Sequence, residues 1–312
     1  MQLHITHDTR YSYSPATELA LHMAHLKPPD TRHQQRIDHR LEITPKPVVL
    51  NETLDVFGNV RAFFEIDEPH ESLLIRASSV VHTSAPDPVQ SLMSWEAVRD
   101  AFVYHADIEW HPAAEYVYPS VYVHPGAAFA EYALPSFAPG VPLIDAARDL
   151  MHRIHTEFTY ASDSTEISTP PVEALENRRG VCQDFSQVML ACLRSMGVPA
   201  RYVSGYLLTQ PPPGMPRLVG SDASHAWVSV FLPDVAARNG GHGWYDLCPT
   251  NHREGWGTPG EDYVRLAVGR DYSDISPMRG VIHGSGHHEL SVGVTVEPFG
   301  VPAAAGTPEI HP

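Results

Sequence analysis

The chain has 312 residues, 43% of them hydrophobic, and a formal net charge of −16 at pH 7. This length predicts two domains, and the acidic balance without a basic stripe argues against a nucleic-acid partner, because phosphate binding requires clustered Lys and Arg. The chain has no run of 18 apolar residues and no cationic segment followed by an apolar one, so we expect neither a membrane span nor a signal peptide. Three cysteines without a CxxC pattern favour free thiols in a reducing compartment, and we expect a cytoplasmic protein.

The first part of the chain is typical of an antiparallel β module. Short runs of β-type residues are separated by turn signals such as Pro28-Pro29-Asp30. The runs cover residues 3–7, 20–25, 37–43, 60–66 and 73–81. We therefore predict an α+β protein with a β-rich domain at residues 1–120, a core at 121–297 and a flexible tail at 298–312, where Pro, Ala and Gly prevail.

Helical patterns begin after a Pro-, Gly- and Ala-rich segment at residues 118–142. Apolar residues spaced by three and four from Leu143 to Phe158 predict one helix, with Pro142 at its first position. A short helix is expected after Thr169 and before Gly180. A third helix begins near Cys182, and the same periodicity continues until Gly197 ends it.

Cys182 is the candidate nucleophile because it opens this third helix. A thiol in the first turn lies near the positive end of the helix dipole and near unpaired N–H groups, which favour a thiolate and predict a lowered pKa. Cys192 lies on the apolar face of the same helix, so we expect a structural thiol there. Asp184 is expected to complement the helix start.

A candidate base and a group to orient it lie further along the chain. Residues 224–231 alternate in character as a strand does, which places His225 and Trp227 on one face. Residues 244–248 predict another strand. A carboxylate on that strand would accept the second imidazole N–H of His225 and fix its tautomer.

Three motifs in this order carry a family resemblance. They are GVCQDFS at residues 180–186, SHAWVSVFL at 224–232 and GWYDLCPTN at 243–251. The chain resembles the bacterial transglutaminase-like superfamily, and its opening segment resembles the β-rich amino-terminal domain of many bacterial members. The resemblance implies a papain-like core, Cys182 as the nucleophile and His225 as the general base. It also implies a peptide or protein amide substrate, with Trp227, Gln183 and Asp184 at its rim and no cofactor or metal.

The third catalytic position departs from the family pattern. The family has an aspartate directly before Pro-Thr, where this chain has Cys248. Asp246 lies two residues earlier, about 6.6 Å away along a strand, so it needs a bulge or bend to reach His225. We rank Asp246 first because a carboxylate stabilises an imidazolium better than a neutral thiol does. The alternatives are Cys248 as a weak partner or a buried hydrophobe, and Asn251 as the substitute.

The functional hypothesis is a thiol-dependent amide or peptide hydrolase, or acyl transferase, that works through an acyl-enzyme. We favour hydrolysis because the chain lacks a calcium-loop pattern. A cross-linking transamidase and a non-catalytic binding module of the same fold are the alternatives. The loop at residues 209–216 is considered as a lid. His283, His287 and His288 have metal-ligand character, but we expect a solvated loop. The sequence does not indicate an oligomeric state.

Overall fold

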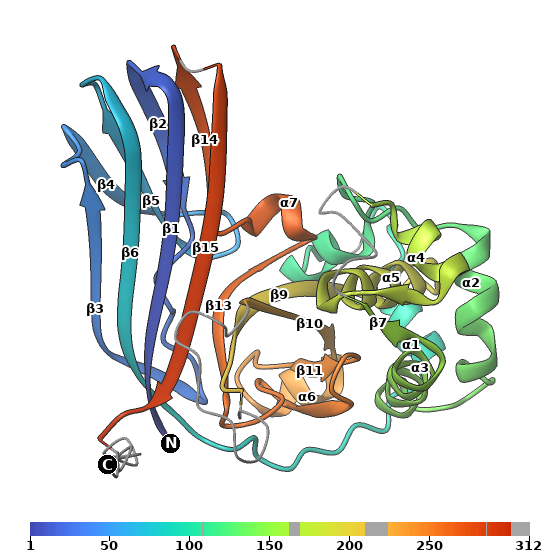
Figure 1. Cartoon of the computed structure of the whole chain (residues 1–312). Coiled ribbons are helices and arrows are strands. Elements are labelled where there is room, and N and C mark those ends of the chain that lie inside the picture. Colours follow the sequence, from blue (N-terminus) through green and yellow to red (C-terminus); the bar gives the residue numbers. More distant parts are fainter. Residues whose placement is uncertain (108, 162–168, 210–223, 285, 301–312) are drawn as a thin grey trace, which may run out of the picture.

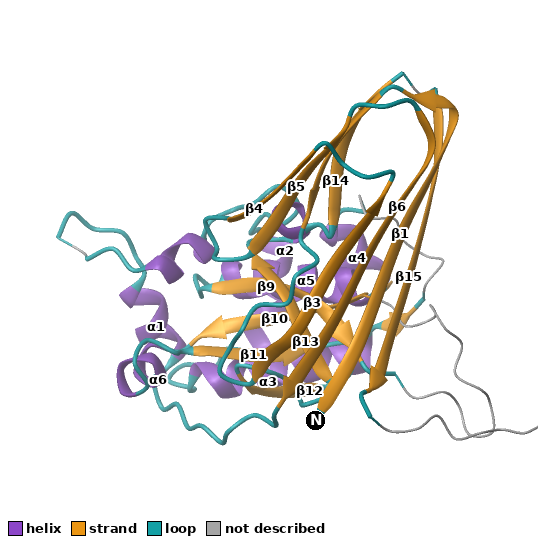
Figure 2. Ribbon diagram, turned by 90° about the vertical axis from the view of Figure 1, so that its left-hand side faces the viewer, coloured by secondary structure: helices purple, strands orange, loops and turns teal. Residues whose placement is uncertain are grey.

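The computed structural model describes residues 1–107, 109–161, 169–209, 224–284 and 286–300. Two four-stranded antiparallel sheets pack together as a β-sandwich, and a five-stranded antiparallel sheet beside them carries helices on its far side (Figures 1 and 2). This arrangement confirms the predicted α+β class with a β-rich amino-terminal module. Within the described residues, the helices are too short or too polar to cross a membrane.

The β-sandwich is built from strands whose side chains alternate between its core and its surface. In the first strand Leu3 and Ile5 are buried, whereas Thr6 and Asp8 point outward. Each fully buried aliphatic or aromatic side chain contributes about 1.5–3 kcal/mol. The sheet orders are β15-β1-β6-β3 and β14-β2-β5-β4. The strands are β1 (Gln2–Thr17), β2 (Leu19–Ala24), β3 (Gln34–Thr44), β4 (Val49–Leu54), β5 (Val60–Ile66), β6 (His70–Thr83), β14 (Met278–His283) and β15 (His287–Pro298).

The last two strands return to the sandwich, which corrects the predicted domain limits. β15 pairs along β1, and β14 pairs along β2, so two strands that would otherwise be exposed edges gain partners. Residues 278–297 therefore belong to the sandwich and not to the core. The first boundary also falls before residue 120, because Trp95 and Val98 pack in the helical core. Of the predicted tail, residues 301–312 lie outside the described residues.

The second part has a five-stranded sheet of order β12-β11-β10-β9-β13. Its strands are β9 (Ala200–Leu207), β10 (Ser224–Phe231), β11 (Trp244–Cys248), β12 (Arg253–Trp256) and β13 (Tyr263–Gly269). A short parallel pair, β7 (Thr159–Tyr160) and β8 (Arg179–Gly180), forms a separate two-stranded sheet. The helices are α1 (Trp95–Ala101), η1 (Pro112–Val117), α2 (Ala127–Ala133), η2 (Leu134–Ser136), α3 (Leu143–Glu157), α4 (Pro171–Asn177), α5 (Cys182–Ser195), α6 (Pro233–Arg238) and α7 (Tyr272–Ile275).

Helix α5 is the centre of this part. It packs against β9 and β10, and its apolar side chains lie in one core with Leu150 and Ile154 of α3 and Val228 of β10. Gly197 ends the helix with φ +76°, a conformation that favours glycine. The three predicted helices are therefore confirmed, with Pro142 preceding α3 as its cap.

The sandwich and the five-stranded sheet contact one another directly. Tyr206 on β9 lies in the sandwich core, and its hydroxyl is 2.9 Å from Nδ1 of His7. The turn between β4 and β5 reaches β13, because the Asn59 side chain donates to the Val268 carbonyl at 2.7 Å and accepts from its N–H at 2.8 Å. This turn therefore lies against the edge of the sheet that carries His225.

Candidate active site

The chain at Gly180 and Asp184 fixes the start of α5. The Asp184 carboxylate is buried and accepts a hydrogen bond from the backbone N–H of Val181 at 2.8 Å. This bond gives a partner to a backbone N–H group at the start of the helix. A Cβ on Gly180 would lie 2.6 Å from Asp184 Cβ, so only glycine fits. The expected role of Asp184 at the helix start is confirmed. Cys182 follows as the first residue of the helix.

Cys182 lies beside the strand that carries His225. Its sulfur accepts hydrogen bonds from the backbone N–H groups of Ala226 and Gln183. Ala226 directly follows His225, and β11 pairs with β10 only from Val228 onward. The structure thus brings the candidate thiol and the candidate base to the same end of β10.

The ring of His225 is held by Cys248 and Asn251. Nε2 of His225 lies 3.2 Å from Cys248 Sγ and 3.3 Å from Asn251 Nδ2. The Asn251 amide also donates to the Tyr263 hydroxyl at 3.1 Å, and that hydroxyl bonds Cys248. The imidazole is therefore fixed through Nε2. Tyr263 is a residue that sequence reasoning did not find, because β13 reaches the site only through long-range pairing.

Asp246 does not lie at His225, contrary to the expected ranking. Its carboxylate accepts hydrogen bonds from the Ser229 hydroxyl and from Trp227 Nε1, the latter at 3.2 Å. The β10–β11 register runs without a bulge and sets Asp246 opposite Ser229, four residues from His225, which is about 13 Å of strand. Cys248 and Asn251, the two alternatives, occupy the position instead.

The Cys248 thiol is buried among hydrogen-bond donors. The Tyr263 hydroxyl and the backbone N–H groups of Thr250 and Asn251 bond its sulfur, and Arg253 adds a nearby positive charge. All of these favour a thiolate, but burial outweighs them and leaves the pKa of Cys248 above its ordinary value. Cys248 is therefore a neutral thiol near pH 7.

Two of the three residues expected at the substrate rim are buried. The side chains of Trp227 and Asp184 are 1% and 2% exposed. Trp227 stacks on His225 with ring centroids 6.2 Å apart and lies over Gly205, where a Cβ would be 2.6 Å from its ring. Trp227 thus supports His225 from within the protein. Gln183 is partly exposed beside Cys182.

Burial sets the charge states of the candidate thiol and the candidate base. It raises the pKa of Cys182 to about 11 and lowers that of His225 to about 4. Both shifts favour a neutral thiol beside a neutral imidazole. The expectation of a lowered cysteine pKa is therefore wrong in this structure, because the two N–H bonds to the sulfur do not offset its loss of solvent.

These pKa values predict how Cys182 responds to pH. A thiol with a pKa near 11 is almost wholly protonated at pH 7, and its thiolate fraction grows about tenfold per pH unit below the pKa. We expect iodoacetamide to alkylate Cys182 about tenfold faster at each unit from pH 7 to pH 10. Cys192 and Cys248 are fully buried and should stay unlabelled in the folded protein, as peptide mass spectrometry can check. A rate that levels off below pH 8 would show a thiolate–imidazolium pair instead.

The remaining candidate residues lie elsewhere. His283 ends β14 and lies 3.4 Å from Glu18, whereas His287 and His288 begin β15. No group of three or more His, Cys, Asp or Glu among the described residues is arranged to hold a metal ion. Of the loop considered as a lid, residues 210–216 lie outside the described part of the chain.

Both parts of the chain match known family models. The bacterial transglutaminase-like N-terminal region matches residues 3–82, and the transglutaminase-like superfamily matches residues 135–249. An uncharacterised protein of Mycobacterium tuberculosis is 40% identical over 301 residues, which cover 95% of this chain and 92% of the relative. A protein-glutamine gamma-glutamyltransferase of Pseudomonas aeruginosa is 30% identical over 99 residues, which cover 31% of this chain and 14% of the relative.

A solved structure shares the whole fold. The crystal structure of a candidate cysteine protease from Cytophaga hutchinsonii has a TM-score of 0.71 and 18% identity, with 96% of this chain and 91% of that chain covered. The likeness therefore extends over the sandwich as well as the core. Together with the two family matches and the sequence relatives, it shows that the chain belongs to the transglutaminase-like superfamily.

Proposed function

We propose that the protein is a thiol-dependent hydrolase or acyl transferase that acts on amide bonds of peptides or proteins. The observation that carries this proposal is the position of the Cys182 sulfur. It bonds the N–H of Ala226, next to His225, while Nε2 of that histidine is held by Cys248 and Asn251. A nucleophile beside a base that is itself oriented by a third group is the arrangement of covalent acyl transfer.

The proposed reaction begins from neutral groups. In the neutral tautomer that carries its proton on Nε2 and donates it to the Cys248 sulfur, Nδ1 of His225 has the free lone pair and takes the Cys182 proton as the sulfur attacks the carbonyl carbon. The protonated imidazole then gives this proton to the leaving amine, and a thioester on Cys182 remains. Water or a second amine attacks the thioester and frees the thiol. Backbone N–H groups in the first turn of α5 stabilise the oxyanion that forms at each attack.

We favour water as the second reactant, with transamidation as the alternative. The similar Cytophaga hutchinsonii structure is that of a candidate cysteine protease and supports hydrolysis, while the Pseudomonas aeruginosa relative is named for glutamine transfer. Reactions run with and without a primary amine distinguish the two. A non-catalytic module remains the competing class, because neutral Cys248 stands where an acid stabilises the imidazolium.

Trapping the acyl-enzyme tests the proposal. An activated p-nitrophenyl ester of a blocked amino acid should release one equivalent of nitrophenol in a burst. Mass spectrometry of the acid-quenched protein should then place the acyl group on the Cys182 peptide. The matched control is Cys192→Ala, which should give the same burst. Acylation spread over lysines, without a burst, would contradict a thiol enzyme.

A further inference from the structure

Arg201 lies between two hollows at the junction of the sandwich and the five-stranded sheet. One hollow, of about 650 Å³, is rich in aromatic rings and includes Trp244 and Phe231. The other, of about 230 Å³, is lined by Arg265 and Trp256 among others. Arg201 belongs to both linings although its side chain is only 8% exposed. A guanidinium is thus buried where two cavities meet.

The guanidinium of Arg201 has no acceptor within the described part of the chain. Its Nε is buried without a hydrogen-bond partner, and no ion pair joins it to a described residue. Its close contact is with the ring of Trp244, 4.1 Å from Cζ. The Nε of Arg265 is buried and unpaired as well. A buried charged donor without an acceptor loses its hydration without compensation, so this arrangement calls for an explanation.

Arg194 provides a comparison, because it is a buried arginine with a structural role. Its side chain is also buried, at 3% exposure. It donates to the Ala200 carbonyl at 3.2 and 2.9 Å, to the Ser120 hydroxyl at 3.0 Å and to the Arg270 carbonyl. The contrast with Arg201 indicates that the unmet donors of Arg201 are not a general property of buried arginines here.

The charges around Arg201 leave an excess of positive charge. Asp246 is the buried carboxylate near both Arg201 and Arg265, and its hydrogen bonds already go to Ser229 and Trp227. The other acids of the two hollows have partners of their own. Glu115 pairs with Arg270 at 3.5 Å, and Asp30 pairs with Arg36 at 3.8 Å. Burial lowers the pKa of Arg201 to about 10, so it stays protonated at neutral pH.

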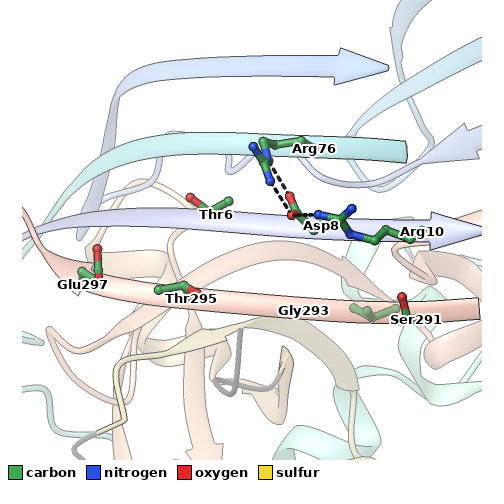
Figure 3. Close-up of a pocket in the computed structure, with 9 residues that line it drawn as sticks. Thr6, Asp8, Arg10, Arg76, Ser291, Gly293, Thr295 and Glu297 are labelled. Atoms are coloured by element: carbon green, nitrogen blue, oxygen red, sulfur yellow. Dashed lines mark hydrogen bonds and ion pairs between the residues drawn. The ribbon is translucent and has the colours of Figure 1, made fainter. Parts of the chain in front are cut away.

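The polar hollow on the outer face of the sandwich lacks this imbalance, because its lining holds Asp8 and Glu297 as well as Arg10 and Arg76 (Figure 3). There Asp8 receives two hydrogen bonds from Arg76, at 2.7 and 2.6 Å, and one from Arg10 at 3.2 Å. Arg76 and Arg10 are partly or largely exposed. The donors of that hollow are thus paired with the carboxylate or exposed to solvent.

We propose that Arg201 and Arg265 bind the carboxylate of a small molecule whose aromatic body lies against Trp244 and Phe231. A guanidinium presents parallel N–H donors that match the two oxygens of a carboxylate, and the aromatic lining suits a flat apolar group. The carboxylate supplies the acceptors that the described protein residues do not. This site is separate from Cys182, because Arg201 lies opposite Ser229, four residues along β10 from His225.

Ligand titration of the whole chain tests this site. Phenylacetate at millimolar concentration should raise the melting temperature and quench tryptophan fluorescence to saturation. Phenylacetamide has the same shape without the charge and should do neither. Inorganic phosphate should compete with phenylacetate for the guanidinium. Equal effects of the acid and the amide, or no effect of either, would overturn the proposal.

Two variants separate binding from folding. Arg201→Met should abolish the phenylacetate shift and leave the unliganded melting temperature unchanged or higher, because it removes a buried, poorly paired charge. Arg194→Met is the matched control and should lower the melting temperature strongly, since it strands the groups bonded to that side chain. If Arg201→Met lowers it as much, Arg201 is structural and the proposal fails. Alkylation of Cys182 should be unchanged in Arg201→Met, so this outcome is independent of the proposed enzyme activity.

Discussion

Cys182→Ala is expected to abolish amide cleavage and acyl transfer, and His225→Ala to lower kcat by about 10²- to 10⁴-fold. In the proposed mechanism Cys182 supplies the sulfur of the acyl-enzyme, and Cys192 and Cys248 are fully buried, so neither thiol replaces it. In the same mechanism His225 moves a proton, a role in which water replaces it poorly. Amine release from a chromogenic peptide amide at saturating substrate measures both effects.

The controls for this prediction distinguish chemistry from folding. Cys192→Ala alters a buried thiol on the same helix and should keep the activity within a few-fold. Melting temperatures report whether each variant is folded, since His225 packs on Trp227 and Tyr263. Full activity in Cys182→Ala would end the thiol mechanism. An unfolded His225→Ala with normal activity per folded molecule would make His225 structural.

The elements that carry the candidate site could be predicted because their signals are local. A 3.6-residue period of apolar residues between Gly180 and Gly197 predicts helix α5. The alternating character of residues 224–231 predicts β10. The position of Cys182 at a helix start follows from these signals alone. Its closeness to His225 does not, because it depends on how α5 packs across the sheet.

Long-range strand pairing accounts for what the sequence did not reveal. β15 pairs with β1 from Leu3 with Pro298 to Ser14 with His287, a separation along the chain that no local period encodes. Tyr263 reaches Cys248 only because β13 pairs with β9. The domain limits were therefore misplaced, and a residue of the site was missed.

The prediction of a lowered pKa for Cys182 failed because two opposing effects differ in size. A favourable helix terminus contributes about 0.3–1 kcal/mol, which is less than one pKa unit. Burial of an ionisable group shifts its pKa by up to about 3–5 units when it is complete, and for the partly exposed Cys182 loss of solvent still raises the pKa to about 11. The sequence reveals the helix start but not the depth of burial, so the smaller effect was visible and the larger one was not.

The choice of Asp246 over Cys248 failed for a geometric reason. A strand step of two residues is about 6.6 Å, and a regular register between β10 and β11 leaves no bulge to shorten it. A carboxylate is the better chemical partner for the imidazole, but Asp246 lies too far along the strand to reach His225. Asp246 lies instead in the field of Arg201 and Arg265.

Cys248→Asp is expected to raise the pKa of His225 by about 1–3 units and to speed alkylation of Cys182 at pH 7, since an opposite charge within reach shifts a pKa by that amount. The new carboxylate would face Nε2 of His225, now 3.2 Å from the Cys248 sulfur. It would raise the pKa of His225 above its present value of about 4 and so stabilise the imidazolium that forms when the ring takes the Cys182 proton. Turnover should rise with it. Iodoacetamide kinetics and the NMR titration of His225 measure the two effects separately.

Cys248→Asn is the matched control because it has the shape of aspartate without the charge. The donors that surround Cys248, the Tyr263 hydroxyl and the N–H groups of Thr250 and Asn251, suit an anion, so Cys248→Asp should fold as well as Cys248→Asn. Equal alkylation rates in the two variants would show that a charge at position 248 does not affect the ionisation of the Cys182 thiol. If the pKa of His225 rose without faster alkylation, the imidazole would not take the Cys182 proton. That result would contradict His225 as the proposed base.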